Sequence, residues 1–172
     1  MGPDRILLIG MMGAGKTTVG HAVGTMLGWP YLDNDMLLAR AVGKDTRRVQ
    51  REDGEAALRR AESAALDVAL TEGGPLVAGV AGGVVLDPLD RQRLRSGGFV
   101  VWLRAEVATL ARRVAGTDRP WLGADPAAAL NRLYAGRAGL YASVASLIVD
   151  VDAMPPDVIA LRVAEVVAPR TR

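Results

Sequence analysis

The feature that most constrains this chain is a glycine-rich turn at residues 10–17, GMMGAGKT. Its spacing is G-x-x-x-x-G-K-[ST], and it follows the apolar run 5–9 (RILLI) and opens a helix expected at 16–28. In such a turn, successive backbone N–H groups face phosphate oxygens, and the helix that follows adds partial positive charge. Lys16 would neutralise the outer phosphates, and the Thr17 hydroxyl would contact Mg²⁺. The pattern therefore predicts a binding site for a nucleoside triphosphate rather than a chance strand-to-helix turn.

Short apolar runs bounded by turn residues are typical of buried strands. Four of them, and a weaker fifth given last, lie at 5–9, 76–80, 99–103, 147–151 and 31–33. Helix-like stretches alternate with these runs, at 16–28, 34–42, 55–72, 87–96, 105–115, 126–142 and 156–168. This alternation predicts an α/β fold in which helices cover both faces of a parallel sheet of about five strands. The 172 residues contain no repeat and no low-complexity linker, so we expect one domain, 1–172.

Composition narrows the class of protein. The chain has no cysteine, which excludes disulfides and thiolate metal sites and suits a cytoplasmic location. Its formal net charge is +2 and it has no dense basic block interleaved with aromatics, so we expect no nucleic-acid partner. No apolar run approaches the ~20 residues of a membrane-spanning helix, and the first residues do not resemble a signal peptide. The guanine-binding motif N-K-x-D does not occur, and the length is too small for most motor or transporter ATPases, which leaves small kinases.

Beyond the phosphate loop, an ordered set of segments resembles the shikimate kinase family over nearly the whole chain. LGWPYLDND at 27–35 is similar to the family's D-[ST]-D segment, and GEAALRRAE at 54–62 is similar to its G-E-x-x-F-R-x-x-E stretch. The other matching segments are VAGVAGGVVL (77–86), DRPWL (118–122), RAGLY (137–141) and VDVDAMPP (149–156). The resemblance implies a three-layer α/β/α P-loop fold of the nucleoside-monophosphate-kinase type, with a substrate-binding segment at about 33–61 and a lid at about 114–125. It also implies transfer of a phosphoryl group from ATP, with Mg²⁺, to the 3-hydroxyl of shikimate.

On the nucleotide side, the resemblance implies that the phosphate loop and its helix bind ATP through Gly13, Ala14, Gly15, Lys16, Thr17 and Thr18. Thr17 and Asp33 would hold Mg²⁺, Asp33 through a water molecule. Arg113 is the best match to an arginine that covers the adenine ring, with Arg112 as the alternative. Pro156 would close the other side of that ring.

The resemblance assigns the chemistry to Lys16, Asp35 and Arg119. Asp35 would bind the substrate hydroxyls, position the attacking one and take its proton. Arg119, on the lid, would stabilise the charge of the transferring phosphoryl group. Asp33 and Asp35 are two apart, so in an extended chain both would face one site. The alternative is a pair of aspartates that form a turn or cap a helix.

Substrate binding is assigned to two arginines and two glycines. Arg59 and Arg137 match the family's arginines for the substrate carboxylate, which a planar guanidinium can bind with two parallel hydrogen bonds. The alternative is that both are solvated arginines on helix surfaces. Gly82 and Gly83 would bring backbone N–H groups close to the bound ring and the γ-phosphate, and Gly79 would serve strand packing beside the phosphate loop.

The family pattern breaks on the acceptor side. Ala81 stands at the first glycine of the loop, Leu58 at the phenylalanine of G-E-x-x-F-R, Val49-Gln50 at an Ile-Phe pair, and Trp121 at a lid leucine. Two rings of the expected pocket are thus an aliphatic chain and an amide, and the amide needs a polar partner. If Ala81 has a negative φ its methyl group costs little, whereas a positive φ would require a reshaped loop.

These departures leave alternatives for the acceptor. Shikimate is favoured because the aspartates and arginines are kept; another cyclic polyol or an aminoshikimate-like molecule is the alternative. A nucleoside-monophosphate kinase is a further alternative, although an aspartate pair suits an anionic acceptor poorly. A non-catalytic nucleotide-binding protein is disfavoured because Lys16, Asp35 and Arg119 are all present. The sequence does not determine the oligomeric state, for which we expect a monomer.

Overall fold

The computed structural model describes residues 3–117, 119 and 122–167, and within them it contains one parallel sheet of five strands. The strands are β1 (Arg5–Ile9), β2 (Tyr31–Leu32), β3 (Leu76–Gly79), β4 (Phe99–Arg104) and β5 (Leu147–Asp150), in the order β2-β3-β1-β4-β5. Because β1 is the central strand, the phosphate loop that follows it leaves the middle of the sheet's carboxyl edge. All the predicted strands are confirmed, including the weak one at 31–33.

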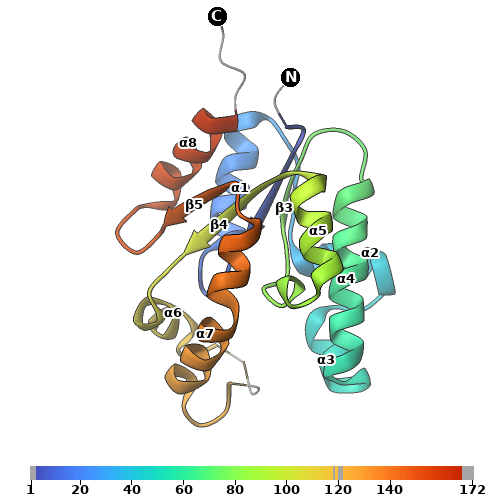
Figure 1. Cartoon of the computed structure of the whole chain (residues 1–172), viewed down its shortest axis with the longest axis vertical. Coiled ribbons are helices and arrows are strands. Elements are labelled where there is room, and N and C mark those ends of the chain that lie inside the picture. Colours follow the sequence, from blue (N-terminus) through green and yellow to red (C-terminus); the bar gives the residue numbers. More distant parts are fainter. Residues whose placement is uncertain (1–2, 118, 120–121, 168–172) are drawn as a thin grey trace, which may run out of the picture.

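Helices cover both faces of the sheet, as Figure 1 shows. α1 (Lys16–Leu27) and α8 (Pro156–Val167) pack together on one face, and α5 (Pro88–Gly97) and α7 (Pro126–Val144) lie on the other. The remaining elements are α2 (Asn34–Val42), α3 (Thr46–Asp53), α4 (Glu55–Thr71), α6 (Val107–Val114) and the short 3₁₀ turn η1 (Val84–Leu86). This arrangement confirms the three-layer α/β/α fold. None of the described helices combines the length and the apolar character that crossing a bilayer requires.

α3 is a helix that the sequence did not predict. In its eight residues, TRRVQRED, only Val49 is buried, so no apolar stripe marks it as a helix. Capping residues define its ends instead. The Asp45 side chain accepts a hydrogen bond from the Arg48 backbone N–H at 2.8 Å, and Gly54, with φ of 83°, ends the helix. α3 packs against α4 and contributes one wall of the site described below.

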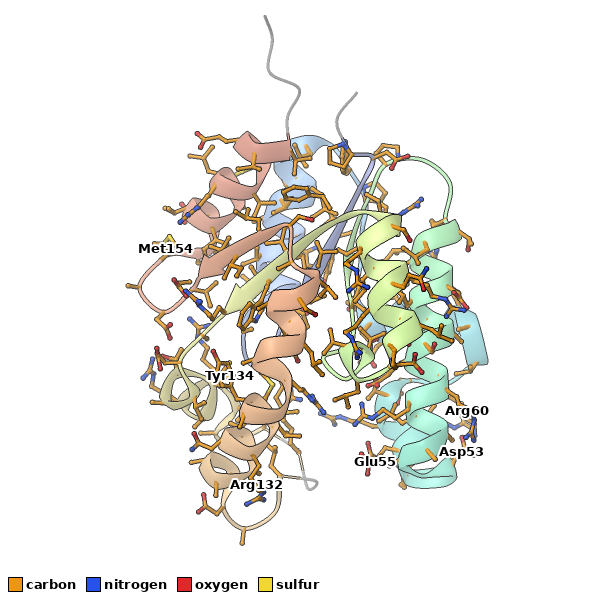
Figure 2. The ribbon with its side chains drawn as sticks, in the orientation of Figure 1. Asp53, Glu55, Arg60, Arg132, Tyr134 and Met154 are labelled. Atoms are coloured by element: carbon orange, nitrogen blue, oxygen red, sulfur yellow. The ribbon has the colours of Figure 1, made fainter. Side chains whose placement is uncertain are left out.

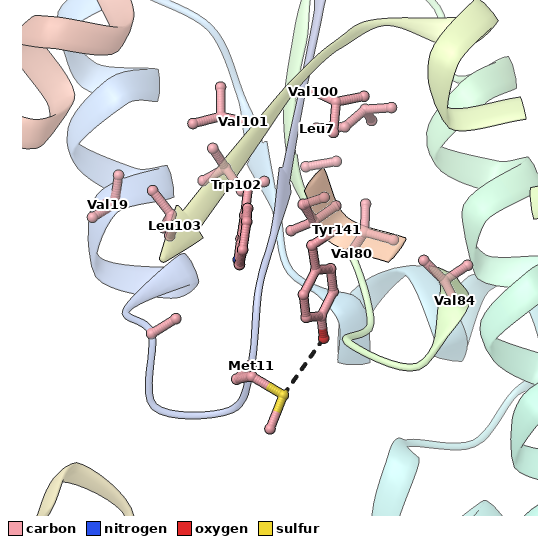
Figure 3. Packing of buried hydrophobic residues seen from close by; sticks show 14 of the residues in the cluster. Leu7, Met11, Val19, Val80, Val84, Val100, Val101, Trp102, Leu103 and Tyr141 are labelled. Carbon is pink, nitrogen blue, oxygen red and sulfur yellow. Dashed lines mark hydrogen bonds between the residues drawn. The ribbon is translucent and has the colours of Figure 1, made fainter. Parts of the chain in front are cut away.

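The core is mainly aliphatic, with two aromatic rings at its lower end (Figure 3). The rings of Trp102 on β4 and Tyr141 on α7 lie 5.6 Å apart. The Tyr141 hydroxyl donates to the Gly82 carbonyl at 2.7 Å and lies 3.7 Å from the Met11 sulfur. Tyr141 therefore joins α7 both to the loop after β3 and to the phosphate loop.

The Tyr31 ring occupies a slot with glycines on two sides. A Cβ atom on Gly20 of α1 or on Gly79 of β3 would overlap this side chain. Gly79 therefore makes room for Tyr31, and it also pairs with Leu8 of β1, the strand that leads into the phosphate loop. The Tyr31 hydroxyl lies beside Thr17, and burial raises its pKa to about 12.

Candidate active site

A cavity of about 600 Å³ opens at the carboxyl ends of β1, β2 and β3, the edge at which folds of this class bind ligands. Its walls come from the phosphate loop, the start of α2, α3, α4, the loop after β3 and α7. The sequence-predicted residues that line it are Gly13, Gly15, Lys16, Thr17, Thr18, Asp33, Asp35, Arg59, Gly82, Gly83, Arg119 and Arg137. Figure 2 shows nitrogen-bearing side chains between α7 and α4, with Glu55 on the side of α4 that faces this space and Arg60 on the opposite side.

The phosphate loop has the backbone that its glycines predict. Gly13 and Gly15 have φ of 81° and 95°, in the left-handed region that favours glycine. Ala14 lies between them with its methyl group in the core, and its backbone N–H donates to the Met11 carbonyl at 3.1 Å. Lys16 Nζ donates to the carbonyls of Gly10 at 2.8 Å and Met11 at 3.1 Å.

The electrostatic surroundings of Lys16 are unusual for a lysine. Burial lowers its pKa to about 8, and the positive charges of Arg119 and Arg137 act in the same direction, whereas Glu62 opposes them. A cation in this setting gains stability when an anion enters, because a nearby negative charge favours the protonated amine. The surroundings of Lys16 therefore favour the entry of an anion.

Asp33 and Asp35 both line the cavity, but the expected reason was wrong. The chain is not extended here, since β2 ends at Leu32 and α2 begins at Asn34. Asp33 is the N-cap of α2 and accepts a hydrogen bond from the Met36 backbone N–H at 2.8 Å, so the capping alternative is correct for this residue. Asp35 lies in the first turn of α2 and accepts hydrogen bonds from Thr46 of α3.

Two oxygen-bearing side chains fit the expected magnesium site. Thr17, at the start of α1, and Asp33 line the same cavity, and the N-cap bond of Asp33 uses only Oδ1. In the described part of the chain, His, Cys, Asp and Glu form no cluster of three that could hold a metal by itself. Mg²⁺ at a nucleotide site uses one or two protein oxygens and takes its other ligands from water and substrate phosphates.

Arg59 is fixed by two glutamates of its own helix, α4. Its Nη1 donates to Glu62 Oε2 at 2.6 Å, and its Nη2 donates to Glu55 Oε1 at 3.3 Å. The guanidinium lies so close to Gly83 that a Cβ atom there would overlap it. Glu62 is only 6% exposed, and burial raises the pKa of its carboxyl, although the Arg59 charge opposes this. Arg59 is thus a positioned arginine at a cavity wall rather than a solvated surface residue.

Arg137 is the second arginine of the acceptor wall, and it comes from α7. It is 7% exposed, so the alternative of a surface arginine is wrong for this position. A Cβ atom on Gly82 would lie 3.0 Å from the Gly10 carbonyl oxygen and 3.7 Å from Arg137 Nη1, which explains why a glycine stands there. Arg59 and Arg137 therefore approach the cavity from opposite helices, above the Gly82-Gly83 turn.

Arg119 also lines the cavity. Its Nε donates to the Thr117 hydroxyl at 3.2 Å. Burial lowers its pKa, with a smaller contribution from Arg47, while Asp35 acts in the opposite direction. Residues 118, 120 and 121, including the lid tryptophan of the family comparison, lie outside the described residues.

Neither of the two residues expected at the adenine ring lines this cavity. Arg113 Nη1 donates to the Gly13 carbonyl at 3.2 Å, and its Nη2 donates to the Val151 carbonyl at 3.1 Å. Arg113 thus joins the phosphate loop to the segment that leads to Pro156, the first residue of α8. Its neighbour Arg112 donates instead to the Thr109 hydroxyl at 3.4 Å. Of the two arginines, Arg113 is the one that reaches the phosphate loop.

The departures from the family pattern fall on the cavity wall. Gln50, Leu58 and Ala81 all line it, whereas Val49 is buried in the core. Among the described residues, positive φ occurs at glycines alone, so Ala81 requires no strained backbone and no reshaped loop. Of the departures within the described residues, the three at Gln50, Leu58 and Ala81 change the lining of the cavity.

Sequence reasoning missed five polar residues of the cavity: Asn34, Thr46, Arg47, Glu55 and Glu62. Thr46 and Arg47 belong to α3, which had no apolar pattern by which to place it. Glu62 had a usable signal, because it follows Arg59 by three residues on a predicted helix, and such pairs are neighbours on a helix surface.

A phosphate loop and a carboxylate- and arginine-lined cavity that share the strand ends of a parallel sheet define a P-loop kinase of small molecules. The family model for shikimate kinase matches residues 12–168, and the chain belongs to the shikimate kinase family. The chain is 41% identical over 152 residues to a shikimate kinase of Bordetella pertussis, covering 87% of this chain and 72% of that protein. A shikimate kinase of Ruegeria pomeroyi is 41% identical over 138 residues, covering 79% and 70%.

Solved structures agree with this assignment. The structure of shikimate kinase from Acinetobacter baumannii in complex with shikimate superposes with a TM-score of 0.87 at 29% identity, covering 94% of this chain and 91% of that one. A gluconokinase from Sinorhizobium meliloti superposes with a TM-score of 0.61 at 22% identity, covering 94% and 93%, which shows the shared fold alone.

Proposed function

We propose that this chain transfers the γ-phosphoryl group of ATP to the 3-hydroxyl of shikimate. The observation that carries the proposal is that Lys16, Asp35, Arg59 and Arg137 line one cavity. This set supplies a cation for the phosphates, a carboxylate for the acceptor hydroxyl and two guanidinium groups for the acceptor carboxylate. The names of the curated relatives and the shikimate complex of a structural neighbour support the same reaction.

In the proposed mechanism, each step is done by a group on the cavity wall. The phosphate loop and Lys16 bind the ATP phosphates, and Arg59 and Arg137 orient the acceptor through its carboxylate. The 3-hydroxyl oxygen attacks the γ-phosphorus, the bond to the ADP oxygen breaks, and Asp35 receives the hydroxyl proton. Arg119 stabilises the negative charge that spreads over the transferring group.

The proposal also assigns residues to the metal ion, to the nucleotide and to the floor under the acceptor. Thr17 and Asp33 would hold Mg²⁺, which neutralises phosphate charge when bound. Gly13, Ala14, Gly15 and Thr18 are assigned to the phosphates, and Arg113 and Pro156 to the adenine. Gly82 and Gly83 would lie under the acceptor ring.

We further propose that these parts form one kinase domain, 1–172, with a substrate-binding segment at about 33–61 and a lid at about 114–125. We also propose a monomer as the working unit. The cysteine-free composition and the small net charge support a cytoplasmic enzyme with no nucleic-acid partner.

The acceptor is the part of this proposal most open to test, because Gln50 and Leu58 stand where the family has rings. The protein is incubated with Mg·ATP and either shikimate, aminoshikimate, quinate, gluconate or AMP, and ADP release is followed. We expect the highest kcat/KM with shikimate. A strong response to another acceptor without one to shikimate would refute the named substrate and keep the kinase.

The role of Asp35 has its own test. Asp35→Ala is expected to abolish turnover while ATP binding is retained. Asp157→Ala, at an exposed position of α8, serves as the matched control.

A further inference from the structure

Asp35 is held in place by a residue of the next helix, α3. The Thr46 hydroxyl donates to Asp35 Oδ1 at 2.5 Å, and the Thr46 backbone N–H donates to the same oxygen at 3.1 Å. Thr46 is the first residue of α3 and Asp35 lies in the first turn of α2, so both contacts cross between the helices. Within the described residues, no hydrogen bond reaches the other carboxylate oxygen, Oδ2.

A third residue fixes the direction of the Thr46 hydroxyl. Asn34 Nδ2 donates to Thr46 Oγ1 at 3.1 Å. An ionised carboxylate can only accept hydrogen bonds, so the hydroxyl proton points at Asp35 while its oxygen accepts from Asn34. The chain of donors thus runs from Asn34 through Thr46 to Asp35, and its last bond is strengthened by the carboxylate charge.

We propose that Thr46 is a positioning residue for phosphoryl transfer, whose hydroxyl holds Oδ1 of Asp35 so that Oδ2 faces the acceptor hydroxyl. This inference rests on the role given to Asp35 in the proposed function. Thr46 lines the same cavity as Asp35, so the contact lies at the wall where the acceptor is bound. With one oxygen bonded twice, the carboxylate does not rotate freely, and its productive orientation exists before the acceptor arrives.

The decisive variants are Thr46→Val, which removes the hydroxyl at nearly constant volume, and Thr46→Ser, which keeps it. For Thr46→Val we expect kcat to fall about 10- to 100-fold, the loss typical of a misplaced catalytic group, while KM for ATP stays within about twofold. Thr46→Ser is expected to restore kcat to within about threefold of the wild type. Thr71→Val, at an exposed threonine near the end of α4, measures what a generic Thr→Val change does.

Two results would overturn the inference: a wild-type kcat in Thr46→Val, or a Thr46→Ser variant as slow as Thr46→Val. If the wild type itself does not phosphorylate shikimate, the proposed function fails, and the positioning role is decided by crystal structures of the wild type and Thr46→Val. We expect the Asp35 side chain to leave its wild-type rotamer in that variant. An unmoved Asp35 would refute the positioning role whatever the acceptor is.

Discussion

The phosphate side and the acceptor side of the cavity are built in different ways. The phosphate side is one contiguous segment, residues 10–18, and its cation Lys16 is held by backbone carbonyls of the same segment. The acceptor side is assembled from α2, α3, α4, the loop after β3 and α7, and side-chain contacts hold it together. A local motif thus specifies where phosphate binds, whereas the choice of acceptor depends on tertiary contacts that can change one residue at a time.

The largest expected effect is on the phosphate side. Lys16→Met keeps the length of the side chain but removes the charge that would stabilise the transferred phosphoryl group, so we expect kcat/KM to fall about 10³-fold. Steady-state kinetics with a coupled ADP assay measures this. Lys44→Met is the matched control, since Lys44 pairs with Glu52 and Asp53 at the surface, and its removal is expected to leave kcat/KM within about twofold. Similar rates for the two variants would contradict the assignment of the loop.

On the acceptor side, a loss of binding is expected rather than a loss of chemistry. Arg137→Lys keeps the charge but loses the planar fork, so KM for shikimate should rise about 10- to 100-fold while KM for ATP changes little. Arg132→Lys changes an exposed arginine on the same helix, labelled in Figure 2, and is expected to leave both constants unchanged. A rise in KM for ATP instead would place Arg137 on the phosphate side and remove the contrast between the two sides.

The smallest expected effect concerns stability, and it tests how the acceptor wall is held. Burial raises the pKa of Glu62 above the ordinary glutamate value near 4.5, with the Arg59 charge opposing. Below that value the carboxyl is neutral in both the folded and the unfolded chain. As the pH rises through the raised pKa, ionisation is less favourable in the folded protein, so the wild type loses stability relative to Glu62→Gln.

Calorimetric melting temperatures at several pH values between 4.5 and 7.5 measure this difference. Glu55→Gln removes the exposed partner of the same arginine and shows the cost of a lost Arg59 contact. A wild type that gains stability over Glu62→Gln as the pH rises would mean that the Arg59 ion pair outweighs burial.

Much of the fold followed from the sequence, because the strands are apolar runs that need no tertiary information. The phosphate loop was equally clear, since its geometry depends on glycines at fixed spacing. α3 was missed because its eight residues bury only Val49, and its existence depends on caps and on packing against α4. The placement of Asp33 and Asp35 at one cavity was right, but the reason was a helix start rather than an extended chain.

Residue types also could not show which arginines were buried. Arg59 and Arg137 were assigned through a family resemblance, and their surroundings became visible only when α4 and α7 were placed on opposite sides of the Gly82-Gly83 turn. The contact between Thr46 and Asp35 could not be anticipated, because it requires the relative position of two helices, one of which was not expected.

The slot that holds Tyr31 restricts the order in which this protein can change over evolutionary time. Gly20 and Gly79 stand on two sides of one side chain, so a methyl group at either position requires a smaller residue at position 31 first. The reverse order would pass through a chain in which Tyr31 overlaps a new side chain on α1 or β3. A substitution at Gly20 or Gly79 is therefore expected to be tolerated only after Tyr31 has been replaced by a smaller residue.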